Sequence, residues 1–126
     1  QFSRLSLRGL LIMRQLNITP PLAEALPNIG LLTNVVELTY YDMIYIYHRL
    51  KHKSRIELRR EHNHIFDKNA VEVYFEGFKL GYISLKVNSI VAKQMDRGST
   101  ILARVKSVKK HKNTPLGGLD IEVMIM

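Results

Sequence analysis

The chain has 126 residues, a formal net charge of +8 at pH 7 and 46% hydrophobic residues, so we expect one folded domain with a surplus of positive charge. It has no cysteine, which excludes disulfides, thiolate zinc sites, iron–sulfur clusters and cysteine nucleophiles. The longest apolar run near the start is too short to cross a membrane or to form a signal peptide. These features predict a cytoplasmic protein with a polyanionic partner and no membrane association.

The first 30 residues differ in composition from the rest of the chain. Residues 1–18 carry leucine and isoleucine near helical spacing, which predicts a short amphipathic helix. Residues 19–30 contain three prolines and end in a glycine, a composition that breaks regular structure. We therefore expect residues 1–30 to be a lead-in segment and residues 31–126 to form the domain.

From residue 31 the pattern becomes typical of β-strands. The runs at 31–41 and 44–50 are rich in β-branched and aromatic residues, and residues 55–61 predict a further strand. Residues 70–76 alternate apolar and polar side chains, and Gly77 separates them from the similar run at 78–84. Two alternating runs joined by a short glycine-containing turn predict a β-hairpin.

The last 40 residues predict one helix and two more strands. Apolar residues recur at helical spacing over 87–98, and Gly98 occupies the position of a C-terminal cap. Residues 99–108 and 119–126 alternate as strands do, and a basic, glycine-rich loop is expected at 109–118. About six strands and one short helix predict a mostly β fold, a small, OB-like, partly closed β-barrel.

A polar loop with the sequence RREHNHIFDKNA (residues 59–70) lies between two predicted strands. Single-stranded nucleic acid is bound by positive side chains along the phosphates and by aromatic faces on which bases stack. The chain offers both kinds of residue. The aromatic candidates are Tyr40, Tyr41, Phe66 and Tyr82, and the basic ones are Lys51, Lys53, Arg55, Arg59, Arg60, Arg104 and Lys106. The structural alternative is that Phe66 and one of the two adjacent tyrosines belong to the core, because strand aromatics usually pack inward.

Asp67 is unexpected beside phosphates, because a carboxylate repels them. A structural role is to stabilise a turn, since aspartate and asparagine bind nearby backbone groups and the sequence DKN suits that role. A functional role is to accept hydrogen bonds from a sugar hydroxyl or a base edge, which allows the end of a strand to be recognised. The residues alone leave both roles open.

Two other classes of function have candidate residues in the sequence. A metal-dependent hydrolase would use His62, His64 and Asp67, but two histidines spaced HxH are a weak indication of zinc. The sequence has no nucleophile elbow and no phosphate-binding GxxxxGK[ST] loop, so we expect no catalytic residue, cofactor or metal ligand. A protein-interaction adaptor would pair a sheet edge, or the run IYIY at 44–47, with another chain.

Three stretches resemble the HIRAN domain family. They are YYD at 40–42, the sequence IELRREHNHIFDKNAVEVYFEGFKLGYI at 56–83, and the helix that ends MDRG. The family pattern is a strand, an Arg-Glu-Pro-x-Asn-x-Tyr-Asp-x-Asn-Ala-Val loop and a Leu-Gly-Tyr or Leu-Gly-His hairpin, and the resemblance covers roughly residues 31–126. It implies an OB-like barrel that binds DNA in repair or processing, either as a nearly standalone bacterial-type protein or beside a translocase or nuclease partner.

The resemblance also implies roles for individual residues. In eukaryotic members the pocket captures the 3′-hydroxyl end of single-stranded DNA, which gives Tyr40 and Phe66 stacking roles and makes Asp67 the acceptor of the terminal hydroxyl. Zinc binding and acid-anhydride hydrolysis, sometimes attributed to the family, are assigned to larger fusion partners. The residues expected to bind nucleic acid are Tyr40, Tyr41, Arg59, Arg60, Asn63, His64, Phe66, Asp67, Lys68, Asn69 and Tyr82.

The chain departs from the family pattern at several positions. Thr39 stands where eukaryotic members have an arginine before the tyrosine pair, and His64 and Ile65 replace an asparagine or other polar residue and a proline. Phe66 lacks the phenol hydroxyl of the loop tyrosine. A charge-assisted contact to the terminal phosphate would therefore have to come from Arg59, Arg60 or His64.

Overall fold

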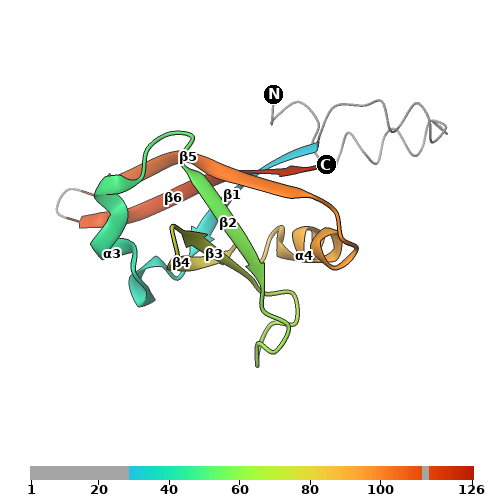
Figure 1. Ribbon diagram of the computed structural model, residues 1–126. Helices are drawn as coiled ribbons and strands as arrows, with labels where there is room; N and C mark the ends of the chain where they lie inside the picture. Colours follow the sequence, from blue (N-terminus) through green and yellow to red (C-terminus); the bar gives the residue numbers. More distant parts are fainter. Residues whose placement is uncertain (1–28, 112–113) are drawn as a thin grey trace.

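The computed structural model describes residues 29–111 and 114–126, and it contains six antiparallel strands. Figure 1 shows how these strands curl around one another. The strands close into a barrel in the order β1-β4-β3-β2-β5-β6, so the barrel is fully closed rather than partly closed. The strands are β1 (Ile29–Val36), β2 (Arg55–Arg60), β3 (Val71–Phe75), β4 (Phe78–Ile83), β5 (Ile101–His111) and β6 (Thr114–Ile125). The helices are α3 (Met43–Ile46) and α4 (Asn88–Asp96), with 3-10 turns η1 (Leu38–Tyr40) and η2 (Tyr47–Arg49). The mostly β, OB-like prediction is confirmed.

Alternation along the strands builds the core. On β3, Val71, Val73 and Phe75 are buried inside the barrel, as their spacing predicted, while Glu72 and Tyr74 lie on the outer face. The predicted hairpin is also present, because Val73 lies opposite Gly81 and Phe75 opposite Phe78. The inside of the barrel is therefore apolar, and the polar side chains of these strands are left on its outer surface.

Gly81 allows β4 to close the barrel against β1. A Cβ atom at this position would lie 2.1 Å from the carbonyl oxygen of Val36, closer than any side chain can approach. The two strands pair through Val35 opposite Ile83 and Val36 opposite Tyr82. The glycine of the Leu-Gly-Tyr sequence is thus required by the close approach of two backbones.

Two of the predicted strands are wrong in extent or type. The run at 31–41 forms a strand only as far as Val36, because Glu37 takes a left-handed backbone conformation with φ of 65° and starts η1. The run at 44–50 forms α3 and η2, so the predicted IYIY strand edge does not exist. Met43, Ile46 and Leu50 are buried, a helical spacing of three and four residues, and this packing overrides the β-propensity of the tyrosines and isoleucines.

The basic loop predicted at 109–118 is also shorter than expected. Strand β5 continues to His111 and β6 begins at Thr114, so most of this stretch is a two-stranded hairpin. Val108 lies opposite Leu119 and Lys109 opposite Gly118. Lysine and glycine indicated a loop, but lysine is also frequent on exposed strand edges, which is the setting here.

The predicted helix at 87–98 is confirmed as α4, and it ends as its sequence indicated. Gly98 has a φ of 83°, its N–H donates to Met95, and the N–H of Ser99 donates to Gln94, both at 3.0 Å. This is the Schellman arrangement that favours glycine. The predicted helix at 1–18 lies outside the described residues, and the domain boundary at residue 31 stays a prediction, with β1 beginning at Ile29.

Candidate nucleic-acid interface

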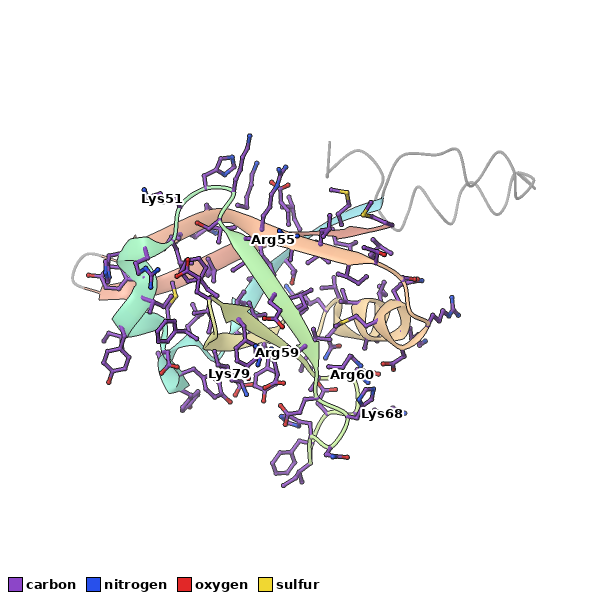
Figure 2. The ribbon with its side chains drawn as sticks, viewed as in Figure 1. Lys51, Arg55, Arg59, Arg60, Lys68 and Lys79 are labelled. Atoms are coloured by element: carbon purple, nitrogen blue, oxygen red, sulfur yellow. The ribbon has the colours of Figure 1, made fainter. Side chains whose placement is uncertain are left out.

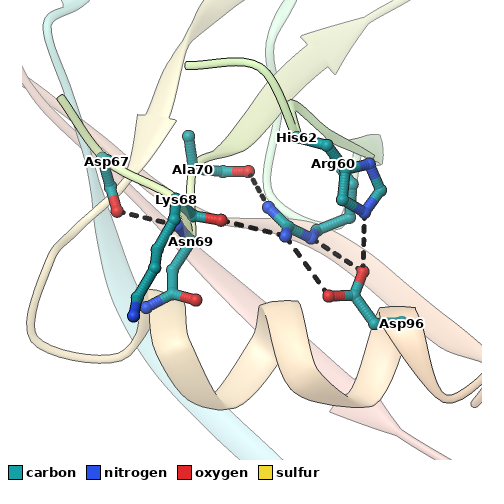
Figure 3. A network of polar contacts seen from close by, with 7 residues as sticks. All are labelled: Arg60, His62, Asp67, Lys68, Asn69, Ala70 and Asp96. Atoms are coloured by element: carbon teal, nitrogen blue, oxygen red, sulfur yellow. Dashed lines mark hydrogen bonds and ion pairs between the residues drawn. The ribbon is translucent and has the colours of Figure 1, made fainter. Parts of the chain in front are cut away.

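Arg60 holds the loop between β2 and β3 (residues 61–69) against helix α4. Its side chain is 9% exposed, and its Nε and Nη2 donate to the two carboxylate oxygens of Asp96 at 2.9 and 3.3 Å. The remaining donors reach the carbonyl oxygens of Ala70 at 2.6 Å and Lys68 at 3.1 Å (Figure 3). The guanidinium group is therefore engaged within the fold, and the predicted contact of Arg60 with nucleic acid stays a prediction.

Asp96 is the anchor on the helix side. The imidazole Nε2 of His62 lies 3.0 Å from the same carboxylate that accepts from Arg60 (Figure 3). The hydrogen bonds from Arg60 and His62 hold the pKa of the Asp96 carboxyl below its usual range. Ionised Asp96 thus ties the start of the loop to the end of α4.

His64 and Asp67 shape the inside of the loop. The Nδ1 atom of His64 accepts hydrogen bonds from the backbone N–H groups of Phe66 and Asp67, both at 3.1 Å. The Asp67 carboxylate accepts from the N–H of Asn69 at 2.9 Å and from the side-chain amide of Asn88 at 2.7 Å. The turn role predicted for Asp67 is thus present, and the same bonds fix the orientation of its carboxylate.

The tip of the loop presents two apolar side chains to solvent. Ile65 is 88% exposed and Phe66 is 91% exposed, so the alternative that placed Phe66 in the core is wrong. The Phe66 ring lies edge-on to His64, with 6.4 Å between ring centres. An aromatic ring held at the surface of a braced loop is available for stacking on a base.

A second aromatic group surrounds Tyr82 on β4. Tyr82 is buried, lies edge-on to Tyr41 and His64, donates a hydrogen bond to Glu61 and accepts one from Lys79 at 2.8 Å. Burial and the bond to Glu61 raise the pKa of Tyr82. Burial alone would lower the pKa of Lys79, but its bonds to Tyr82 and to Glu72 outweigh this and raise it. These groups form a closed polar network, and a nucleic-acid contact by Tyr82 or Tyr41 stays a prediction.

Arg59 lies on the outer face of β2, next to the inward-facing Arg60. It donates to both oxygens of Glu57, at 3.0 and 3.1 Å, and its guanidinium carbon lies 3.8 Å from the centre of the Tyr74 ring. The hydrogen bond from Arg59 lowers the pKa of the Glu57 carboxyl, and this effect outweighs slight burial, which raises it. Asn63 and Lys68 are exposed on the loop, and nucleic-acid contacts by Arg59, Asn63 and Lys68 stay predictions.

An open groove of about 1160 Å³ lies where β1 ends, and Glu37 and Asp120 are the acidic residues in its lining. Its walls are the end of β1 with η1, residues 84–87 and the β5–β6 hairpin. Tyr40, 76% exposed, lies on one wall, and the basic residues of the groove are Lys86, Lys106 and Lys109. Two of these lysines form ion pairs: Lys106 Nζ lies 3.6 Å from Glu122, and Lys109 Nζ lies 3.2 Å from Asp120. Among the described residues, no carboxylate forms an ion pair with Lys86.

Sequence reasoning missed Lys86 and Lys109 because they come from separate elements. Only closure of the barrel brings residues 84–87 opposite the hairpin, although the basic run at 109–112 was a signal for part of this wall. None of residues 61–70 lines the groove. Val87 does line it, and the next residue, Asn88, donates to Asp67. Asn88 therefore links the Asp67 carboxylate to the segment that forms one wall of the groove.

A closed antiparallel barrel with a basic groove along one side defines a small OB-like binding domain. Sequence comparison identifies the family. Residues 31–123 match the HIRAN domain, and the chain belongs to that family, as its motifs predicted. HIRAN domains are generally nucleic-acid-binding modules and are not themselves catalytic.

Two solved structures share the fold. A protein from Lactobacillus plantarum has a TM-score of 0.66 and 23% identity, covering 79% of this chain and 97% of that chain. The HIRAN domain of human HLTF has a TM-score of 0.61 and 21% identity, covering 76% of this chain and 74% of that chain. No curated protein sequence matches the chain.

Two further findings bear on the alternatives. Among the described residues, no three histidine, aspartate or glutamate side chains are grouped closely enough to hold a metal ion. His62 is instead bound to Asp96, and His64 accepts from the backbone of its own loop. The part of the chain that the structure describes has no helix long and apolar enough to span a membrane.

Proposed function

We propose that this domain binds single-stranded DNA in DNA repair or processing, with the strand in the basic groove and its 3′-hydroxyl end at Asp67. The groove supplies lysines for phosphates, and Tyr40 and Phe66 supply exposed rings on which bases can stack. The domain supplies binding only, so a partner protein or a fused translocase or nuclease would carry out any catalytic step.

The observation that carries the proposal is the fixed carboxylate of Asp67, which Asn88 links to the segment that forms one wall of the groove. Asn69 and Asn88 each donate one hydrogen bond to it, and each carboxylate oxygen has a second lone pair that can accept another. A terminal 3′-hydroxyl is a donor that this carboxylate can accept. A terminal phosphate carries negative charge and would be repelled, which gives the site a way to distinguish the two ends.

The groove also predicts how binding depends on salt. If Lys86, Lys106 and Lys109 each neutralise one phosphate, the logarithm of the affinity should fall with the logarithm of salt concentration with a slope of about −2. The ion pairs that Lys106 and Lys109 make with acidic residues would then exchange for phosphate contacts. An affinity that does not change with salt would contradict this arrangement.

Fluorescence anisotropy with two labelled ten-nucleotide strands tests the end-recognition step. One strand ends in a 3′-hydroxyl and the other in a 3′-phosphate. We expect the hydroxyl strand to bind about tenfold more tightly, which corresponds to one charge-assisted hydrogen bond. Asp67→Asn should abolish the difference while its remaining oxygen still accepts from Asn69.

Glu76→Gln is the matched control, because it removes one exposed carboxylate in the β3–β4 turn, outside the groove and the loop. It should leave the preference for the hydroxyl strand unchanged. Equal binding of both strands by the unaltered protein would contradict end recognition and leave a general single-strand site. Binding of neither strand would contradict the proposal as a whole.

A further inference from the structure

A second cluster of basic side chains lies where β2 begins, away from the loop. We call Lys51, Lys53, Arg55 and Arg104 the strand-start patch. Figure 2 shows Lys51 and Arg55 near one end of β2, with Arg60 and Lys68 toward the other. Arg55 and Arg104 are direct cross-strand partners on β2 and β5. Two like charges in this relation repel each other, and Glu122 offsets the charge of Arg104 but not that of Arg55.

The backbone that carries this patch is firmly held. The N–H of Lys53 donates to the carbonyl of Val105, and the N–H of Val105 donates to Ser54, both at 2.8 Å. The N–H of Lys51 donates to the Ser54 hydroxyl at 2.9 Å. Lys53 has a φ of 74°, a conformation that costs energy for any residue other than glycine. The cationic side chains are thus displayed from a fixed turn.

Carboxylates pair with Arg104 but not with the other three residues of the patch. Glu122 is buried and binds Arg104 at 3.1 Å and Lys106 at 3.6 Å. Glu57, the next outward residue on β2, is occupied by Arg59. Among the described residues, no carboxylate lies within ion-pair distance of Lys51, Lys53 or Arg55. The positive charge of Lys51, Lys53 and Arg55 is therefore available to an anionic partner.

The composition of the patch favours duplex backbone over single strands. Single-strand sites combine positive charge with exposed rings, but the large exposed apolar side chains of the described residues lie elsewhere and none belongs to the patch. Duplex DNA turns its bases inward and presents lines of phosphates, which purely cationic surfaces bind. An acidic protein segment would have less regularly spaced charge.

We propose that the strand-start patch binds the phosphate backbone of the double-stranded part of a DNA whose single-stranded 3′ end occupies the groove. This inference rests on the proposed function. Lys106, two residues after Arg104 on β5, lines the groove and lies between the two surfaces.

The test compares three labelled DNAs by fluorescence anisotropy. They are a ten-nucleotide single strand with a 3′-hydroxyl, a blunt duplex, and the same duplex with a ten-nucleotide 3′ overhang. The variant is Lys53→Gln with Arg55→Gln, and the control is Lys93→Gln with Arg97→Gln, which removes the same charge from exposed positions on or just after α4. Thermal unfolding of both variants verifies that they fold.

We expect the unaltered protein to bind the tailed duplex more tightly than the single strand. The patch variant should weaken binding of the tailed duplex about tenfold and make its salt slope about 2 smaller, since two phosphate contacts are lost. Its affinity for the single strand should change less than twofold. The control variant should change neither DNA by more than about twofold.

Each contrary result has a distinct meaning. If the single strand binds but the duplex adds no affinity, this inference fails and the proposed function stands. If the single strand does not bind but the blunt duplex binds through the patch, the proposed function fails and the patch is confirmed as a duplex site. If the patch variant loses equal affinity for the single strand and for the tailed duplex, the duplex assignment is overturned. It is also overturned if the unaltered protein binds polyglutamate more tightly than duplex DNA of equal charge.

Discussion

The two ends of β2 carry the same residue type in opposite circumstances. At its end, Arg60 is nearly buried and donates to Asp96, Lys68 and Ala70. At its start, Arg55 is exposed and faces another arginine across the sheet. One guanidinium group is used to build the fold, and no carboxylate of the described residues pairs with the other.

This contrast shows that basic residues cannot be assigned to an interface by charge alone. Arg59 and Arg60 are neighbours in the sequence, yet strand alternation sends Arg59 outward and Arg60 under the loop. The number of internal acceptors, rather than the net charge of +8, decides which cations are free to bind DNA. By this criterion Lys51, Lys53 and Lys86 are better candidates than Arg60.

The largest effect should come from removing the internal arginine. Arg60→Gln should lower the free energy of unfolding by about 2–3 kcal/mol, because the bonds to Asp96 are lost and two backbone carbonyl oxygens lose their donors. Urea unfolding at neutral pH measures this change. Single-strand binding should weaken as well, since the loop that holds Asp67 is no longer tied to α4.

Arg59→Gln is the matched control at the neighbouring position. Its side chain is exposed and its ion pair with Glu57 lies at the surface, so the free energy of unfolding should hardly change. If Arg60→Gln were as mild as Arg59→Gln, Arg60 would not brace the loop. Its predicted contact with nucleic acid would then become the better explanation of its position.

An intermediate effect should appear as a dependence on pH. Bonds from Arg60 and His62 lower the pKa of Asp96, so its contribution to stability is present above the unfolded pKa of about 3.9 and is lost as the pH falls through the lower folded value. As the pH falls below about 4, the protein should therefore lose stability more steeply than Asp96→Asn does. Urea unfolding at several pH values measures both curves, which should converge at the acid end. Parallel curves would contradict this role.

The smallest effect should be a gain in stability. Arg55→Gln removes the repulsion from Arg104 and should raise the free energy of unfolding by about 0.2–1 kcal/mol at low salt. The gain should vanish at high salt, because exposed charges are then screened. The same variant should bind the tailed duplex less tightly. A loss of stability at low salt would show that Arg55 has a structural partner, as Arg60 does.

Features set by local sequence could be predicted. The hairpin around Gly77 and the helix ending at Gly98 follow from alternation, helical spacing and glycine at positive φ. The turn role of Asp67 was one of two roles deduced from the sequence DKN. The inward position of Arg60 was also readable, since Ile56, Leu58 and Arg60 share one face of β2 by simple alternation.

Features set by tertiary packing could not be predicted. The residues at 44–50 have strand propensities, and only the burial of Met43, Ile46 and Leu50 shows that they must be helical. Asn88, which orients Asp67, is 21 residues away in the sequence. The groove lysines come from segments that meet only when the barrel closes, so no local pattern connects them.

Two seams of the barrel have few backbone pairs, and one of them lies at the groove. Strand β1 pairs with β6 at six positions but with β4 at two, Val35 and Val36, and β2 also pairs with β5 at two. Local opening has its lowest free energy where the fewest backbone bonds must break, so amide hydrogens at the β1–β4 seam should exchange with solvent earlier than those between β1 and β6. Residues beside this seam, at 32–40, 84, 86 and 87, line the groove. Breathing of the β1–β4 seam would therefore widen the groove while β1 stays paired with β6.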